Sequence, residues 1–221
     1  RRRGRGDRSG LVGGIAPPAR VSHRTFADLL AEEGVVEVCE LRSRIGFMAY
    51  HGGALEEMTD VIARAAAEQS DASFYGVLQP DHLKWHISSH KVSPDDSPML
   101  QSFLEHVDLV ITVHGYGRNN MWTTLLLGGQ NRDLAEHVAG HLRPALPDYT
   151  IETDLHSMPR ELRGLHHRNP VNLPRQQGVQ IELPPRVRGR SPVWQGWPEG
   201  ELVPPTVALI DGLAAAATTW S

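Results

Sequence analysis

The sequence has one cysteine, few aromatic residues, little net charge and no long hydrophobic run. Cys39 alone cannot form an internal disulfide, and a zinc site built from several thiolates is also excluded. No stretch approaches the roughly 20 consecutive apolar residues of a membrane-spanning helix, so we expect no membrane association. The net charge of −4 is too small to indicate a nucleic-acid-binding surface. Aromatic residues are 6% of the chain and form no obvious interface patch, so the oligomeric state is left open.

The length of 221 residues suits one large domain, preceded by a segment of different composition. Residues 1–20 are basic and glycine-rich, and we interpret them as a flexible tail; the alternative is a nucleic-acid-binding arm. Residues 21–221 then form the single domain. Cys39 lies in a strand-like stretch of it, where a small buried residue is a better interpretation than a nucleophile.

Hydrophobic periodicity predicts strands that alternate with helices. We expect strands at residues 35–41, 45–50, 73–78, 84–90, 109–113, 123–127, 149–153 and 178–183. Helices are expected at residues 25–33, 55–69, 100–107, 131–144 and 209–219. The first two strands are candidates for an antiparallel pair. This alternation indicates a three-layer α/β/α domain with a mixed, largely parallel sheet. The polar stretch 155–177 is a long loop, of a length that usually carries function.

Two histidines come directly after buried strand-like runs and directly before a glycine. His51 follows residues 45–50, and His114 follows residues 109–113, the clearest buried strand of the sequence. Glu56 lies where the pattern predicts the first turn of a helix. Ligands of open α/β sheets bind at the carboxyl ends of the strands, so we expect these three side chains to meet there. Two imidazoles and a carboxylate leave the fourth zinc position for water, as in catalytic zinc sites; the alternative is a pair of core histidines.

A lone carboxylate interrupts the last apolar strand. A zinc hydrolase needs a base that is not a metal ligand, and Glu182 is the candidate because burial of a carboxylate without a purpose is costly. Its neighbours Ile181 and Leu183 are expected to face a helix layer, which turns Glu182 to the other side or into the crevice. The alternative is a structural carboxylate paired with Arg186 or Arg188.

Six short segments carry a resemblance to a known family: HGGALEEMT at 51–59, WHISS at 85–89, VHGY at 113–116, LGG at 127–129, NPVN at 169–172 and GVQIEL at 178–183. In this order they resemble the zinc-dependent poly-γ-glutamate hydrolases, first associated with bacteriophages that digest bacterial capsules. That family is similar in fold to the zinc carboxypeptidases. The resemblance implies one zinc ion held by His51, Glu56 and His114, with Glu182 as the general base.

The chain departs from the family where a substrate carboxylate would be held. The family pattern Asn-Ile-Val-Asn-Arg is replaced by residues 169–172 followed by Leu-Pro, so the arginine is displaced to Arg175. A guanidinium pairs bidentately with a carboxylate, which makes Arg118, Arg168 and Arg175 candidates for substrate binding, together with Asn172. Each arginine is equally well interpreted as a solvated surface residue. His86 and His90 are candidates for the rim of the cleft, although His86 is better interpreted as a core or supporting histidine.

The leading hypothesis is therefore a zinc-dependent hydrolase of amide bonds, acting on γ-glutamyl linkages or another acidic amide. Within the enzyme class, the alternative is a deacylase of a small N-acylated acidic amino acid. Outside it, the alternatives are a non-catalytic zinc-containing binding module and a phage-related nucleic-acid factor that works through the arginine-rich tail. No signal peptide is visible, so we expect a cytoplasmic protein, or a secreted or phage-released one if the N-terminus is trimmed.

Overall fold

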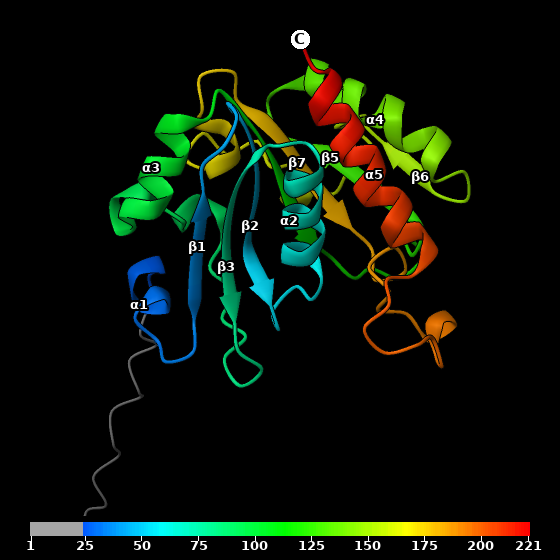
Figure 1. Cartoon of the computed structure of the whole chain (residues 1–221), viewed down its shortest axis with the longest axis horizontal. Helices are drawn as coiled ribbons and strands as arrows, with labels where there is room; N and C mark the ends of the chain where they lie inside the picture. The colour runs from blue at the N-terminus through cyan, green and yellow to red at the C-terminus, as the bar shows by residue number, and fades with distance from the viewer. Residues whose placement is uncertain (1–23) are drawn as a thin grey trace, which may run out of the picture.

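A computed structural model describes residues 24–221, and the predicted tail lies outside the described residues (Figure 1). Seven strands form one sheet in the order β1-β3-β2-β4-β7-β5-β6. The strands are β1 (Val36–Glu40), β2 (Ile45–Gly53), β3 (Ser73–Gln79), β4 (Leu109–Gly115), β5 (Thr124–Gly128), β6 (Thr150–Glu152) and β7 (Gly178–Leu183). The helices are α1 (Phe26–Leu30), α2 (Thr59–Gln69), α3 (Pro98–His106), α4 (Arg132–Ala145) and α5 (Pro204–Thr219). Among residues 24–221, no helix combines the length and apolar character needed to cross a bilayer.

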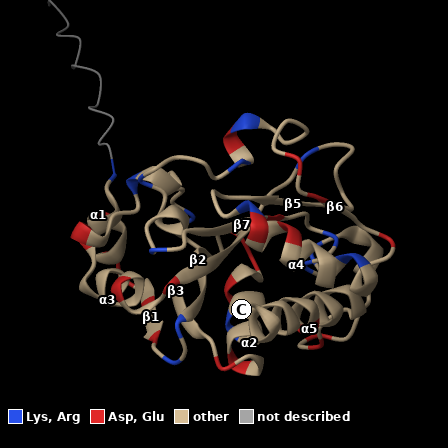
Figure 2. Ribbon diagram, turned by 90° about the horizontal axis from the view of Figure 1, so that it is seen from above, with Lys and Arg blue, Asp and Glu red and all other residues tan. Residues whose placement is uncertain are grey.

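The sheet is mixed and largely parallel, as the sequence predicts. Pairs β2–β3, β2–β4, β4–β7 and β5–β6 are parallel, whereas β1–β3 and β5–β7 are antiparallel. Strand β2 shows how the two faces are filled. Phe47 and Ala49 pack into the core beneath α2, α4 and α5, while Met48 and Tyr50 pack into the core beside α1 and α3. Figure 2 shows α2, α4 and α5 together on one side of the sheet.

Two expectations are wrong, one about the pairing of the first two strands and one about the start of the helix that follows them. Strands β1 and β2 are not neighbours, because β3 lies between them and pairs antiparallel with β1 and parallel with β2. Helix α2 begins at Thr59 rather than at residue 55, because Met58 has a left-handed backbone with a φ of 75°. Glu56 therefore lies in the turn before the helix, where its N–H donates to the His51 carbonyl oxygen over 2.9 Å. The two glycines after His51 belong to the end of β2 itself.

The predicted strand at residues 84–90 is also wrong. This stretch is a loop that ends in a short 3-10 helix, Ser89–Lys91. Its backbone groups bond to side chains instead of to a strand. The Trp85 N–H donates to Gln79 Oε1 over 2.6 Å, and Gln79 Nε2 donates to the Trp85 carbonyl over 2.9 Å. A short alternating stretch can thus be held as a loop when a buried amide satisfies its backbone.

Strands β4 and β7 place two predicted site residues side by side. Their parallel register pairs His114 with Glu182 and Thr112 with Gln180. Ile181 packs into the core beneath α2, α4 and α5. Because side chains alternate along a strand, Gln180 and Glu182 point to the opposite face. There, loops from residues 84–98 and 155–177 border the sheet and leave a cavity.

Candidate active site

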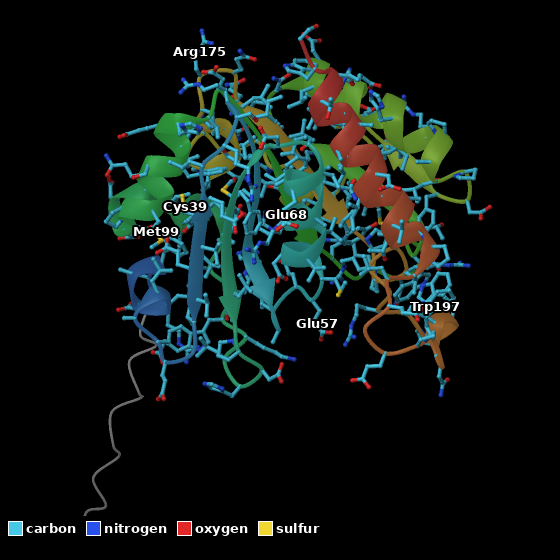
Figure 3. The ribbon with its side chains drawn as sticks, in the orientation of Figure 1. Cys39, Glu57, Glu68, Met99, Arg175 and Trp197 are labelled. Carbon is cyan, nitrogen blue, oxygen red and sulfur yellow. The ribbon has the colours of Figure 1, made fainter. Side chains whose placement is uncertain are left out.

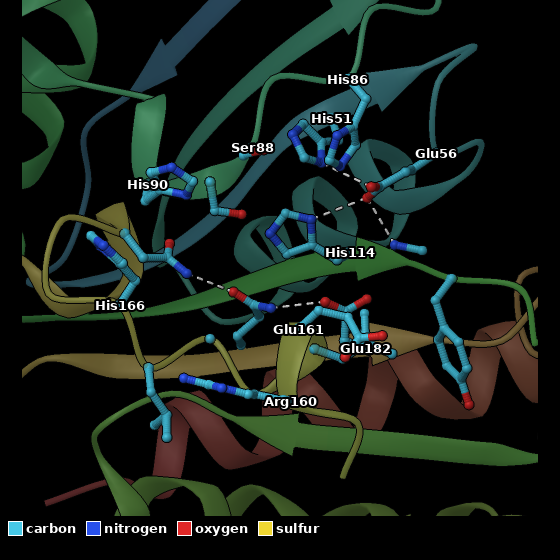
Figure 4. A pocket seen from close by; sticks show the side chains of 18 residues that line it. His51, Glu56, His86, Ser88, His90, His114, Arg160, Glu161, His166 and Glu182 are labelled. Carbon is cyan, nitrogen blue, oxygen red and sulfur yellow. Dashed lines mark hydrogen bonds and ion pairs between the residues drawn. The ribbon is translucent and has the colours of Figure 1, made fainter.

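His51, Glu56 and His114 converge at the ends of β2 and β4. One ligand atom from each lies within 4.8 Å of the others, so these three residues could hold a metal ion. Oε1 of Glu56 lies 2.8 Å from His51 Nδ1, and Oε2 lies 3.1 Å from His114 Nδ1. The Gly115 N–H also donates to Oε2 over 2.9 Å. Glu56 thus sits between the two imidazoles with both carboxylate oxygens engaged (Figure 4).

The outward nitrogens of both histidines are also held. His51 Nε2–H donates to the Ile87 carbonyl over 2.8 Å, and His114 Nε2 lies 3.0 Å from the Tyr50 hydroxyl. These contacts leave Nδ1 as the nitrogen of each ring that faces Glu56. Metal-binding histidines are commonly oriented by such a second partner, which fixes the ring and its tautomer. The donor set and its supports therefore fit a zinc ion, which favours nitrogen and carboxylate ligands.

A buried chain of hydrogen bonds joins His114 to Glu182. The Tyr50 hydroxyl donates to Asn169 Oδ1 over 3.2 Å, and Asn169 Nδ2 donates to Gln180 Oε1 over 2.8 Å. Gln180 Nε2 then donates to Glu182 Oε1 over 2.8 Å. Tyr50, Asn169, Gln180 and Glu182 are all at most 5% exposed. The orientation of the two amides is consequently fixed, and one Glu182 oxygen is held by Gln180 while the side chain lines the cavity.

The two carboxylates have opposite pKa shifts. Burial favours the protonated form of Glu56, but His51 and His114 outweigh it and lower its pKa. Burial likewise acts against protonation of His51, but the Glu56 carboxylate outweighs it and raises the His51 pKa. For Glu182 burial prevails, and its pKa is raised to about 7 although His114 and the Gln180 hydrogen bond act to lower it. Two carboxyl groups whose environments separate their pKa values are typical of acid–base sites.

The cavity beside these residues has a volume of about 560 Å³. It is bordered by His86, Ser88, His90 and His166 on the loops, and by Arg160 and Glu161. The ring of His86 lies 4.8 Å from that of His51, centroid to centroid, and the side chain is exposed, so His86 belongs to the rim rather than to the core. Among the residues that line this cavity, Arg160 is the arginine. It belongs to a short 3-10 helix, Arg160–Leu162, and lies exposed.

The residues predicted to bind substrate lie outside this cavity. Arg118 forms an exposed ion pair with Glu161. Asn172 is buried and holds the loop, since its Nδ2 donates to the carbonyls of Gly164 and His166 over 2.7 and 3.0 Å. Arg168 lines a neighbouring cavity. Arg175 pairs with Asp108 over 3.4 Å, just before β4, so it lies at the opposite end of the sheet from the cavity. Figure 3 shows this separation between Arg175 and Glu57, the residue that follows Glu56.

Cys39 fits its structural interpretation. It is partly buried beside the core near α1 and α3, and burial together with Glu37 and Glu40 raises its thiol pKa. A raised pKa disfavours the reactive thiolate.

Sequence reasoning missed Tyr50, Gln180 and Arg160. Gln180 had a signal, because it lies two residues before Glu182 on the same strand and must share its face. Tyr50 had none, because its contact with His114 depends on the parallel pairing of β2 with β4, which local sequence does not reveal. Arg160 lies in an aperiodic loop, where local sequence carries no information on direction.

Comparison with known proteins agrees with this architecture. The family model described as poly-gamma-glutamate hydrolase matches residues 24–191. The chain belongs to this family. A curated relative, the SPbeta prophage-derived UPF0714 protein YoqZ of Bacillus subtilis (strain 168), is 30% identical over 141 residues. That match covers 63% of this chain and 48% of the relative, so the chain spans about half the length of the relative it matches.

Two solved structures show the same fold. The structure of a bacteriophage poly-gamma-glutamate hydrolase has a TM-score of 0.68 at 18% identity, over 82% of this chain and 87% of that one. The zinc-free apo form of YNDL also has a TM-score of 0.68 at 18% identity, over 88% of this chain and 96% of that one. These likenesses confirm the predicted three-layer α/β/α architecture.

Proposed function

We propose that this protein hydrolyses amide bonds of γ-glutamyl type with zinc bound by His51, Glu56 and His114. The observation that carries the proposal is the convergence of these ligands beside a buried, non-ligand Glu182 over one cavity. Membership of the poly-gamma-glutamate hydrolase family supports the substrate class, and the description of the YNDL structure as a zinc-free apo form supports zinc as the metal. Bound zinc would supply a Lewis acid that polarises the scissile carbonyl and makes water more acidic.

Glu182 is the proton carrier in this proposal. As a carboxylate it takes a proton from the attacking water, and as an acid it returns that proton to the leaving nitrogen of the amide. In the metal-free protein, burial raises the pKa of Glu182 to about 7, which brings it toward the neutral range in which one group can both take up and return a proton. Gln180 holds Oε1 of Glu182 through its Nε2–H, which leaves Oε2 as the oxygen for the water.

Arg160 is the proposed partner of a substrate carboxylate. It takes the role that the sequence assigns to Arg118, Arg168 or Arg175, because it lines the cavity of the proposed metal site. A guanidinium can hold a carboxylate with two parallel hydrogen bonds and so orient the adjacent amide toward Glu182.

Metal analysis and two variants test the proposal. The purified protein should bind one zinc ion, and His114→Ala should lose it. Glu182→Gln should retain zinc but lose hydrolysis of poly-γ-glutamate by a factor of about 100 or more, on the order of a lost general base. Glu68→Gln is the matched control, because it makes the same carboxylate-to-amide change at an exposed position on α2, and it should keep full activity. No zinc uptake by the wild type, or turnover by Glu182→Gln, would refute this mechanism.

The same experiment separates the competing functions. Cleavage of small N-acylated acidic amino acids without cleavage of the polymer would favour a deacylase. Stable zinc binding without cleavage of either substrate would favour a binding module on the same fold.

A further inference from the structure

A second cavity adjoins the proposed active site. Its volume is about 540 Å³, and it is lined by His90, Lys91, Val92, Ser93, Pro94, Asp95, Arg168 and Leu173. His90 lines both cavities, so the two share a wall. In Figure 4, His90 and His166 lie together on the side of His51 and His114 that is opposite to Glu56.

The wall between the cavities is a defined structure. The rings of His90 and His166 lie 4.9 Å apart, centroid to centroid, and join the two loops. His166 Nδ1 accepts the Arg168 N–H over 3.1 Å, and its carbonyl accepts from Asn169 N–H and Asn172 Nδ2 over 2.9 and 3.0 Å. Buried Asn169 and Asn172 therefore fix the backbone that carries Arg168, although that side chain is exposed.

The charges of the two cavities differ in sign. The first contains Glu56, Glu161 and Glu182 against Arg160, so even a bound divalent ion leaves little positive charge for additional carboxylates. The second contains Lys91 and Arg168 against Asp95. A γ-linked glutamate polymer carries one free carboxylate on each residue, so several positive charges beyond the scissile bond would complement it.

We propose that the cavity of His90, Lys91 and Arg168 is a second binding site, which holds the carboxylates of further residues of an anionic γ-glutamyl polymer. The substrate then crosses the His90–His166 wall and spans both cavities, and the preferred substrate is the polymer rather than a small amide. This inference rests on the proposed function of the first cavity. It also gives Arg168 a place in substrate binding without a contact at the metal.

Kinetics on two substrates test the second site. For the double variant Lys91→Gln/Arg168→Gln, the KM for poly-γ-glutamate should rise about tenfold, with kcat within about twofold of the wild type. Its kinetics on the dipeptide γ-glutamyl-glutamate, which is too short to fill both cavities, should be unchanged. The control Arg64→Gln/Arg143→Gln removes the same amount of charge from α2 and α4, and its kinetics on both substrates should match those of the wild type. Salt should raise the wild-type KM for the polymer more than that of the double variant.

The possible results distinguish failure of the second site from failure of the proposed hydrolysis. An unchanged polymer KM, or an equal loss on polymer and dipeptide, overturns the second site and leaves the proposed hydrolysis standing. If the wild type cleaves neither substrate, the hydrolase proposal fails first, and equilibrium binding of fluorescent poly-γ-glutamate then decides the second site. Binding that is weakened about tenfold in the double variant but not in the control supports the second site. Equal binding by the wild type and the double variant refutes it.

Discussion

Replacement of Gln180 by methionine should raise the pKa of Glu182 and move the acidic limb of the activity profile to higher pH. Gln180 Nε2 donates over 2.8 Å to the carboxylate, and this hydrogen bond lowers the pKa of Glu182 against the larger effect of burial. A hydrogen bond to a charged group contributes about 1.5–3 kcal/mol, and a change of one in pKa corresponds to about 1.4 kcal/mol. We therefore expect the limb to move by about one to two on the pH scale.

The assay is the pH dependence of kcat/KM for poly-γ-glutamate, which reports the base of the free enzyme. Bound zinc would lower the pKa of Glu182 in both proteins, so the difference between them would persist. At pH values below the limb, the activity of Gln180→Met should fall about tenfold for each pH unit by which the limb has moved, with the plateau at high pH largely preserved.

Tyr75→Phe is the matched control, because it removes another hydrogen bond to a carboxylate, from the Tyr75 hydroxyl to the partly buried Glu37 over 2.6 Å. Both variants should lose comparable stability, but only Gln180→Met should shift the limb. An unmoved limb in a zinc-loaded, folded Gln180→Met protein would contradict the assignment of Glu182 as base. An equal shift in Tyr75→Phe would show that loss of stability alone moves the profile.

Three further predictions concern stability and binding. In the metal-free protein Glu182 has a pKa of about 7 against 4.5 in the unfolded chain. The folded state thus binds this proton more tightly, and the contribution of Glu182 to stability should fall by about 3 kcal/mol as pH rises from below 4.5 to above 7. Glu182→Gln should remove this contribution in urea unfolding. Gly53→Ala should lower the free energy of unfolding by at least about 2 kcal/mol, since φ is +66° and a Cβ would lie 2.3 Å from the Gln79 carbonyl oxygen. The control Gly140→Ala adds a Cβ that meets nothing within 4 Å, so it should be neutral or stabilising. Arg160→Gln should raise the KM for poly-γ-glutamate about tenfold while zinc content stays the same; an unchanged KM would remove Arg160 from substrate binding.

Much of the fold was predictable because each strand carries its own signal. Residues 109–113 are a continuous apolar run. The side chains of residues 45–50 alternate between the two hydrophobic cores, so the apolar character of the run and the two-residue period of a strand indicate the same structure. The pairing of β1 was not predictable from neighbouring sequence. It depends on β3 returning through α2 to lie between β1 and β2, which is a long-range choice made by packing.

The candidate site divides in the same way. The convergence of His51 and His114 could be predicted because strand ends in an α/β sheet meet at one edge. Glu56 was expected beside them on an incorrect helix start, and the turn that places it is closed by its N–H bond to the His51 carbonyl. The substrate-binding predictions depended on where loop side chains point, and the loops are ordered by buried amides such as Asn172 whose partners are distant in sequence.

The interpretation of Glu182 as a structural carboxylate paired with an arginine has a specific counterpart in the fold. Arg188 is 8% exposed and lies against Gly115, where a Cβ would be 2.7 Å from its guanidinium carbon. Its N–H groups donate to the carbonyls of Leu183 and Glu57 over 3.2 and 2.7 Å, and among residues 24–221 no ion pair joins it to Glu182. Its positive charge nevertheless lowers the pKa of Glu182. Burial lowers the pKa of Arg188 itself, and the nearby Glu56 offsets part of that effect. A buried cation that bonds to backbone stabilises nearby carboxylates without occupying their oxygens, so Glu182 can be buried and still present an oxygen to the cavity.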